Sequence, residues 1–160
     1  MMLEDYLAFA RGDSGEVAQP TDMAMALEEL RSDAERHGHT ATVAFHGLPV
    51  VTVKPASFKR CLANLVSNAA RHANTISITG QRDHRYLNIT IDDDGPGIPA
   101  DMREEVFKPF LRLDDARNQD EGGSGLGLAI ARDIARSHGG DILLSESPMG
   151  GLRAAVRVPV

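Results

Sequence analysis

The sequence predicts an α+β domain, a two-layer α/β sandwich in which several helices cover one face of a mixed β-sheet. Two observations predict this fold. Segments with helical spacing alternate with short strand-forming segments in the first half of the chain, and pairs of alternating segments typical of hairpins lie in the middle and at the end. A chain of 160 residues is long enough to enclose one such core.

The first part of the chain carries two helical segments. Residues 2–11 have apolar side chains at helical spacing for only about three turns, so they are typical of the end of a longer helix. A Gly-Asp-Ser-Gly linker follows at 12–15. Residues 22–37 then form a helix, with Thr21 or Asp22 as its N-cap.

The middle of the chain supplies strands around a further helix. Residues 42–46 and 50–53 are short strand-forming runs that flank a Gly-Leu-Pro turn. A helix follows over 55–73, and a proline stands in its first turn. Alternation of apolar and polar residues over 76–81 and 86–92 predicts a hairpin.

The last third begins with a long polar segment. Residues 99–123 are charged and only weakly periodic, and a segment of this kind inside a compact domain is typical of a functional lid. A helix follows over 126–137. The runs 141–145 and 152–158 close the fold as another hairpin.

Charge, cysteine content and hydropathy exclude several classes of protein. Lys and Arg number 17 and Asp and Glu number 23, and a net charge of −6 excludes a globally basic surface for nucleic acid or anionic lipid. The single cysteine, Cys61, cannot form an internal disulfide, and we expect a buried structural residue rather than a redox switch. No apolar run approaches the roughly 18 residues that a membrane helix needs. We therefore expect no nucleic-acid partner and no membrane contact by this fragment.

Four polar residues share one face of the helix predicted over 55–73. At about 100° per residue, the side chains of Asn64, Asn68, Arg71 and His72 fall together, opposite the apolar face. Amide oxygens suit a hard ion such as Mg²⁺, and the basic side chains suit phosphates. The alternative, an ordinary solvated face, stays open at this point.

Three aspartates, residues 92–94, crowd the end of a predicted strand and run into a Gly-Pro-Gly turn. An ionised carboxylate only accepts hydrogen bonds, so it can recognise an amino group such as that of adenine. The glycines of the turn, Gly95 and Gly97, let the backbone approach a ligand closely. The alternative is an ordinary acidic turn.

A glycine-rich segment, Gly-Gly-Ser-Gly-Leu-Gly-Leu at 122–128, opens the last predicted helix. Backbone amides at the start of a helix, together with the helix dipole, form a phosphate site. The spacing is neither a dinucleotide-binding fingerprint nor a Walker A loop, because the segment follows a loop and lacks Gly-Lys-Ser/Thr. The alternative is a flexible hinge before a helix.

The motifs become more specific when taken together. Asn-x-x-x-Asn-Ala-x-Arg-His, Asp-Asp-Gly-Pro-Gly-Ile, Phe-x-Pro-Phe and Gly-x-Gly-Leu-Gly-Leu follow one another in this order. They resemble the N, G1, F and G2 boxes of the catalytic ATP-binding domain of sensor histidine kinases, whose superfamily includes gyrase, Hsp90 and the MutL ATPases. The resemblance covers about residues 16–160. It implies the family's Bergerat-type ATP-binding fold with a mobile ATP lid.

The resemblance also implies roles for individual residues of the first two boxes. In the N box, Asn68 coordinates Mg²⁺ and Asn64 supports it. The basic residues Arg71 and His72 lie near the phosphates and the nucleotide. In the G1 box, Asp93, rather than either neighbouring aspartate, accepts a hydrogen bond from the adenine amine.

The F and G2 boxes extend this predicted site. The F box matches Phe107, Pro109 and Phe110, and the following Arg112 is a candidate for contact with the γ-phosphate. With Asn68 and Arg71, Arg112 completes the predicted catalytic set. The remaining residues that the resemblance assigns to ATP are Gly95, Gly97, Ile98, Phe110, Ser124, Gly125, Leu126, Gly127 and Leu128.

The activity that the resemblance implies is that of a protein-histidine kinase, which transfers the γ-phosphoryl group of Mg²⁺·ATP to a histidine. None of the 6 histidines of this chain is followed by Glu or Asp, as the family's acceptor is. We therefore expect a catalytic fragment without its phosphoacceptor. Residues 1–12 are predicted to be the tail of a dimerisation helix, and 13–160 the catalytic ATP-binding domain.

The resemblance implies two partners. One is the phosphoacceptor and dimerisation domain, in cis within a homodimeric parent, and the other is the receiver domain of a response regulator. The fragment is expected to be cytoplasmic, which is compatible with a parent anchored in the inner membrane. Three alternatives stay open: a stand-alone ATPase, a regulatory serine kinase of the same superfamily, and a degenerate nucleotide-binding module.

Overall fold

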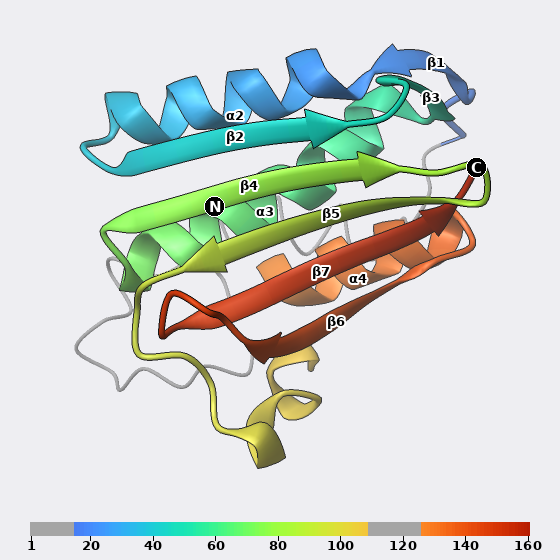
Figure 1. Ribbon diagram of the computed structural model, residues 1–160. Coiled ribbons are helices and arrows are strands. Elements are labelled where there is room, and N and C mark those ends of the chain that lie inside the picture. Colours follow the sequence, from blue (N-terminus) through green and yellow to red (C-terminus); the bar gives the residue numbers. More distant parts are fainter. Residues whose placement is uncertain (1–14, 109–125) are drawn as a thin grey trace.

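The computed structural model describes residues 15–108 and 126–160 and is built around a five-stranded sheet (Figure 1). The strand order is β2-β4-β5-β7-β6. Strand β2 runs parallel to β4, and the other neighbours are antiparallel. The strands are β2 Thr40–His46, β4 Thr75–Arg82, β5 Tyr86–Asp93, β6 Asp141–Glu146 and β7 Leu152–Pro159.

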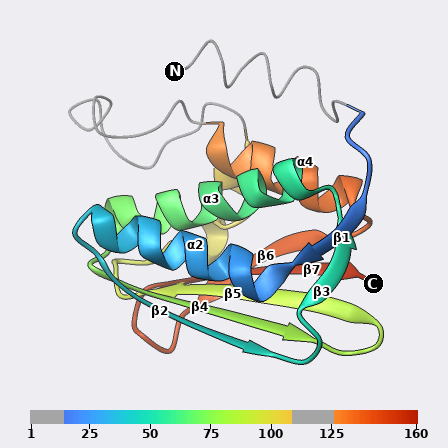
Figure 2. The ribbon, with the colours of Figure 1, turned by 90° about the horizontal axis from the view of Figure 1, so that it is seen from above.

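Three helices cover one face of this sheet, as Figure 2 shows. They are α2 Met23–Arg36, α3 Pro55–His72 and α4 Gly127–Ser137. The mixed sheet and its single helical layer confirm the predicted α+β sandwich. Each of these helices begins and ends within one residue of its predicted bounds, and Asp22, Gly38 and Pro55 mark three of these ends in the sequence.

The start of α2 shows which of the two predicted caps is used. The carboxylate of Asp22 accepts a hydrogen bond from the backbone amide of Met25 at 3.0 Å, so Asp22 is the N-cap. A cap of this kind contributes about 1 kcal/mol to helix stability. Gly38 follows the helix with a φ of 91°, a left-handed conformation that suits glycine.

The start of α3 is capped from a distant part of the chain. Its N-cap residue, Lys54, makes no side-chain capping bond. Instead the carboxylate of Glu16 accepts hydrogen bonds from the amides of Ala56 at 2.7 Å and Ser57 at 2.9 Å. These bonds, chiefly that from Ser57, hold the pKa of Glu16 below its ordinary value. The segment that precedes α2 is therefore fastened to the N-terminus of α3.

One strand was not predicted. Strand β1 (Gln19–Asp22) pairs antiparallel with β3 (Val50–Val53) in a separate two-stranded sheet. The β1 sequence, Gln-Pro-Thr-Asp, has no alternating apolar side chains and contains a proline, so nothing in it indicates a strand. The strands predicted over 42–46 and 50–53 both exist, but they belong to different sheets.

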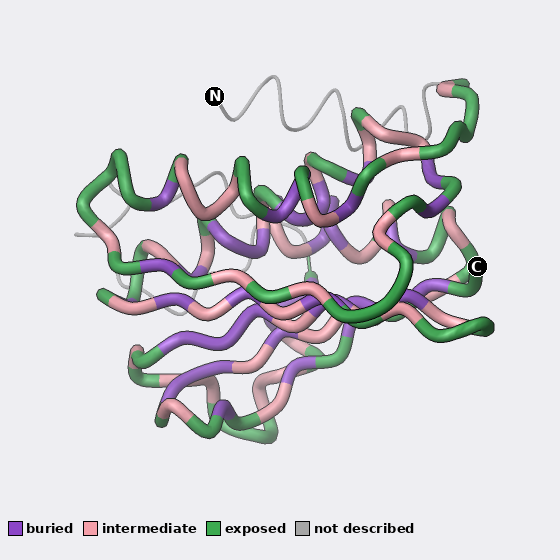
Figure 3. The backbone as a smooth tube through the Cα atoms, turned by 45° about the horizontal axis from the view of Figure 1, so that its top comes forward, coloured by how far each residue is buried: buried purple, intermediate pink, exposed green. Residues whose placement is uncertain are grey.

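The hydrophobic core lies between the five-stranded sheet and the helices, where Figure 3 shows the buried backbone. Every second residue of the central strands points into it, as the period of a strand requires. The helices contribute residues such as Leu27 of α2 and Phe58 of α3. The inward residues of the central strands are Ile76, Ile78, Leu87, Ile89, Ile91, Ala154, Val156 and Val158.

Cys61 lies in this core, between α3 and α4. Its exposed fraction is 0%, and its Sγ donates to the carbonyl oxygen of Ala131 at 3.3 Å. Burial raises the pKa of the thiol to about 12. The prediction of a buried structural cysteine is confirmed.

Two predicted segments fall wholly or partly outside the described residues. The helix over 2–11 lies outside them, as does the part of the polar segment after residue 108. The described part of the polar segment contains two 3-10 helices, η1 (Ala100–Met102) and η2 (Glu105–Phe107). Within the ranges 15–108 and 126–160, no helix is both long and apolar enough to cross a membrane.

Candidate functional site

The predicted site residues that the structure describes gather at one end of the domain, where β5 and α3 end and α4 begins (Figure 1). Two contacts join these elements. The side-chain amide of Asn64 on α3 donates to the carbonyl of Gly127 on α4 at 3.2 Å. The carboxylate of Asp94, after β5, accepts from the amides of Asn74 and Thr75, after α3, at 3.0 Å each.

Asp93 is the last residue of β5 and is only 4% exposed. The alternation of β5 puts it on the same face as Ile91, toward the helices. Its Oδ1 accepts hydrogen bonds from the amides of Gly95 at 2.9 Å and Leu152 at 3.1 Å. No described residue donates to its Oδ2, so this oxygen keeps its capacity to accept a bond from a ligand.

The neighbouring aspartates are engaged in other contacts. Asp92 faces the opposite side of the sheet and forms a bidentate ion pair with Arg153. The Nε and Nη2 of Arg153 donate to Oδ1 and Oδ2 of Asp92 at 2.8 and 3.0 Å. Hydrogen bonds from Thr75 and then Asn74 hold the pKa of Asp94 below its ordinary value. Of the three carboxylates, the geometry leaves Asp93 as the one suited to recognise an amino group.

Glycines let the backbone pass close to Asp93. A Cβ at Gly151 would overlap Asp93 Oδ1 and lie 2.5 Å from the Asp93 carbonyl oxygen. A Cβ at Gly95 would lie 2.6 Å from the carbonyl oxygen of His72 at the end of α3. Gly97 has a φ of 74°, which other residues rarely adopt. The turn after β5 therefore requires glycine at two positions. At Gly95 a side chain would clash with the end of α3, and at Gly97 the backbone conformation suits only glycine.

The polar face of α3 is present as the sequence predicts. Asn64 and Asn68 are half-buried, and Arg71 and His72 are exposed. The guanidinium of Arg71 donates to Oδ1 of Asn68 at 3.1 Å. A positive group therefore lies beside the amide oxygen that is predicted to bind Mg²⁺.

The start of α4 offers backbone donors. The amide of Ile130 donates to the carbonyl of Leu126 at 2.8 Å, so the amides of the three residues between them precede the helical hydrogen-bond series. No side chain in the described part of the chain caps this end. Apart from its chain neighbours and its own helix, no described heavy atom lies within 4 Å of the position that a Cβ of Gly127 would take. Leu126 is fully buried and Leu128 packs against the core, so their side chains anchor the helix start.

The donor set fits Mg²⁺ only together with a phosphate ligand. No group of three or more His, Cys, Asp or Glu side chains able to hold a metal occurs among residues 15–108 and 126–160. Mg²⁺ takes few protein ligands and completes its shell with water and phosphate oxygens, and one or two amide oxygens match that preference. Asn68, with Asn64 one turn earlier, therefore fits the chemistry of this ion.

Some of the predicted site residues lie outside the described part of the chain, and some contacts in the structure have no sequence signal. Phe110, Arg112, Ser124 and Gly125 were predicted to contact ATP and lie outside the described residues. The amide of Leu152 and the close approach of Gly151 were not predicted. Their only sequence signal is a glycine pair between two strands, which is typical of an ordinary turn.

The comparison with known families agrees with this geometry. The family described as histidine kinase-, DNA gyrase B-, and HSP90-like ATPase matches residues 53–160. That region includes the polar face of α3, the turn after β5 and the start of α4. The chain therefore belongs to the family of histidine kinase-, DNA gyrase B- and HSP90-like ATPases.

Comparison with individual relatives identifies which members of this family the chain resembles, namely the sensor histidine kinases. CpxA of Escherichia coli strain K12, a sensor histidine kinase, is 38% identical over 136 residues, which cover 84% of this chain and 30% of CpxA. The solved ATP-binding domain of PrrB from Mycobacterium tuberculosis is 27% identical, with a TM-score of 0.74 over 89% of this chain and 96% of that one. This chain is thus a catalytic ATP-binding domain of the sensor histidine kinase type, and it spans about 30% of the length of CpxA.

A third similarity concerns the fold alone. Full-length ShkA, solved in complex with AMPPNP, has a TM-score of 0.83 and 23% identity, over 99% of this chain and 35% of that chain. The arrangement of sheet and helices described above is therefore also present in a protein solved with a nucleotide analogue.

Proposed function

We propose that this chain binds Mg²⁺·ATP where β5, α3 and α4 meet, and transfers the γ-phosphoryl group to a histidine on a dimerisation domain. The observation that carries the proposal is the buried carboxylate of Asp93. Two backbone amides hold its Oδ1, which fixes the orientation of the group. Its Oδ2 then accepts a hydrogen bond from the exocyclic amine of adenine. Guanine carries a carbonyl at that position, so the same geometry favours adenine.

The adenine ring lies, in this proposal, against the turn that follows β5. Gly95, Gly97 and Ile98 flank the base, and the absence of side chains on the two glycines permits close contact. Phe110 is assigned to ATP contact by the family's F box. The structural support is the position of this turn beside the buried Asp93, whose Oδ1 accepts a hydrogen bond from the amide of Gly95 at 2.9 Å.

The phosphates lie at the start of α4. The amides of Gly127 and Leu128 donate to phosphate oxygens, and the helix dipole favours their negative charge. Leu126 anchors the helix start through its buried side chain. Ser124 and Gly125, which directly precede it in the sequence, extend the same set of donors.

The polar face of α3 provides the metal ligand and positive charge. Asn68 is the proposed Mg²⁺ ligand and Asn64 its support. Mg²⁺, when bound, neutralises charge on the phosphates in the loose transition state of phosphoryl transfer. Arg71, together with Arg112, stabilises the phosphate oxygens electrostatically, and His72 contacts the nucleotide.

The acceptor is a histidine outside this catalytic domain. A bond forms from its ring nitrogen to the γ-phosphorus while the bond from that phosphorus to the ADP oxygen breaks. We assign residues 13–160 to the catalytic domain and 1–12 to the tail of the dimerisation helix. The parent is then a homodimer with its catalytic part in the cytoplasm and an anchor in the inner membrane, and a receiver domain takes the phosphoryl group from the phosphohistidine.

Nucleotide binding is tested by calorimetric titration with AMPPNP, with and without Mg²⁺. We expect Asp93→Asn to weaken binding about ten- to a hundredfold, because a hydrogen bond to a charged acceptor is worth roughly 1.5–3 kcal/mol. Asp92→Asn is the matched control, since it removes the same charge one residue away on the opposite face. Equal affinities of the Asp93 variant and the unaltered protein would overturn the proposed site.

Transfer to histidine is tested separately with a dimerisation domain that carries its acceptor. In the presence of the chain and labelled ATP, the dimerisation domain should acquire an acid-labile phosphoryl group, because phosphohistidine is labile in acid. Acid-stable phosphate on the acceptor would indicate a serine kinase instead. Release of phosphate without any acceptor would indicate a stand-alone ATPase, and binding without either reaction a degenerate module.

A further inference from the structure

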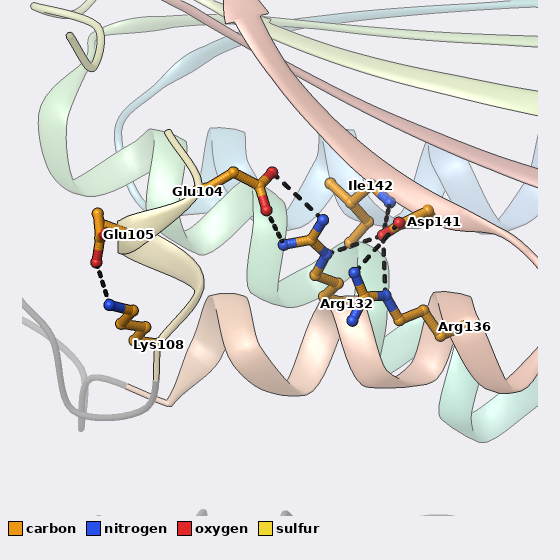
Figure 4. A network of polar contacts seen from close by, with 7 residues as sticks. All are labelled: Glu104, Glu105, Lys108, Arg132, Arg136, Asp141 and Ile142. Carbon is orange, nitrogen blue, oxygen red and sulfur yellow. Dashed lines mark hydrogen bonds and ion pairs between the residues drawn. The ribbon is translucent and has the colours of Figure 1, made fainter. Parts of the chain in front are cut away.

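Arg132, in the middle of α4, lies where three parts of the chain meet (Figure 4). Its Nε donates to Oδ1 of Asp141, on β6, at 2.9 Å. Its Nη1 and Nη2 donate to the two carboxylate oxygens of Glu104, before η2, at 3.0 and 3.3 Å. The guanidinium carbon lies 4.2 Å from the ring centroid of Phe107, within η2. One side chain therefore fastens the η2 region and β6 to α4.

The cation of this network is shielded from water, although both of its carboxylate partners are exposed. The side chain of Arg132 is 15% exposed, against 56% for Arg136 one turn later. Phe107 is buried and belongs to the hydrophobic core. Partial burial opposes the charge of Arg132, but the carboxylates of Asp141 and Glu104 outweigh this and raise its pKa. Stacking of a guanidinium on an aromatic ring stabilises more when the cation is desolvated, whereas ion pairs with exposed carboxylates contribute little to stability.

The η2 region continues from the proposed adenine site. Arg103, one residue before Glu104, donates from its Nε to the carbonyl of Ile98 at 3.0 Å. The path from the turn after β5 to Phe107 is thus held at both of its ends. On the other side, α4 begins with Gly127 at the proposed phosphate site. Arg132 joins these two parts through its hydrogen bonds to Glu104 and its contact with the ring of Phe107.

We propose that Arg132 is a positioning residue for nucleotide binding: it holds the start of α4 at the distance from the turn after β5 that lets one ATP molecule reach both. The inference rests on the proposed function and deepens it. Two subsites at a fixed separation bind a ligand that spans them more tightly than either part of it alone. Loss of Arg132 therefore weakens a spanning ligand and spares a ligand that occupies one subsite.

The experiment compares Arg132→Gln with Arg136→Gln, each titrated with Mg²⁺·AMPPNP and with adenosine. Arg136 is a matched control because it also donates to Asp141 and lies on the same helix, while its contacts with described residues do not reach Glu104 or Phe107. We expect AMPPNP affinity to fall about tenfold in the Arg132 variant and less than about twofold in the Arg136 variant. Adenosine affinity should stay within about twofold of the unaltered chain in both.

Two results would overturn the positioning role. One is an unchanged AMPPNP affinity in the Arg132 variant. The other is an equal loss for AMPPNP and adenosine, which indicates a structural role only. If Arg132→Gln fails to fold, Glu104→Gln decides the question, because Glu104 is 73% exposed and its change removes one arm of the network at the surface. We expect that variant to lose about threefold in AMPPNP affinity with adenosine unchanged. Failure of the unaltered chain to bind AMPPNP would instead refute the proposed function.

Discussion

The side-chain amide of Asn64 on α3 donates a hydrogen bond to the carbonyl of Gly127, the first residue of α4, over 3.2 Å. The bond joins the helix that carries Asn68 to the helix whose first amides face the proposed phosphates. The two residues are 63 positions apart in the sequence. The bond uses the side-chain nitrogen of Asn64, so the oxygen of the same side chain stays on the polar face of α3. The supporting role proposed for Asn64 has a physical basis in this contact.

Replacement of Asn64 by alanine should therefore loosen α4 at its start. A neutral hydrogen bond contributes about 0.5–1.5 kcal/mol, so we expect an AMPPNP affinity about three- to tenfold lower. Calorimetric titration measures the change. Ser67→Ala, an exposed substitution on the same helix, should leave affinity unchanged. An Asn64→Ala variant that binds as tightly as its control would show that the bond does not position the phosphate site.

Gly151→Ala should damage both the fold and the site, because its Cβ would overlap Asp93 Oδ1. We expect the free energy of unfolding in urea to fall by about 1–3 kcal/mol, the usual cost of overpacking, and AMPPNP binding to weaken with it. Gly127→Ala is the contrast, since no described atom outside its own helix and chain neighbours lies within 4 Å of its Cβ position. Its effect on stability should stay within about 0.5 kcal/mol. Equal stabilities of the two variants would contradict the close approach to Asp93.

Cys61 should be inert to thiol reagents in the folded protein. With a pKa of about 12 and an exposed fraction of 0%, the thiol carries almost no thiolate at pH 8 and is out of reach. A colorimetric thiol assay should give no signal until denaturant unfolds the chain. A signal that appears in native buffer at the rate of a small free thiol would contradict the burial of this residue.

The same group makes stability depend on alkaline pH. The folded pKa is raised above the ordinary value of 9.0, so the unfolded chain loses this proton first. The contribution of the buried, protonated thiol to the free energy of unfolding is fully present below pH 9 and is lost as pH rises toward 12. We expect the difference in unfolding free energy between the unaltered chain and Cys61→Ala to shrink across this window. A difference that is constant from pH 8 to 11 would show that Cys61 titrates alike in both states.

The elements with strong periodicity could be predicted from sequence. The helix α3 has a proline at its start and a continuous apolar face, and the hairpin of β4 and β5 alternates cleanly, so local patterns were enough. Strand β1 could not be predicted, because its four residues show no apolar alternation and are held by pairing with β3. Its stability comes from a partner about thirty residues away rather than from its own composition.

The candidate site likewise contains residues that could be predicted from the sequence and contacts that could not. Asp93 could be selected among three aspartates through the family motif, and the contacts of Asp92 and Asp94 give a physical reason for that choice. The second amide on Asp93 Oδ1 comes from Leu152, 59 residues later, and no local pattern indicates it. Arg132 was missed for a similar reason, since an arginine on an amphipathic helix is typical of an ordinary solvated face.

Strand β7 occupies an inner position of the sheet, between β5 and β6, although it is the last strand in sequence order. Its pairing places Arg153 beside Asp92, 61 residues earlier. A nascent chain emerging from the ribosome cannot form these contacts until β7 has been synthesised, and such non-local pairing is slow. Until then β5 has an unpaired edge, and Asp93 lacks the amide of Leu152. We therefore expect the proposed nucleotide site to be complete, and nucleotide to stabilise the fold, only once β7 is in place.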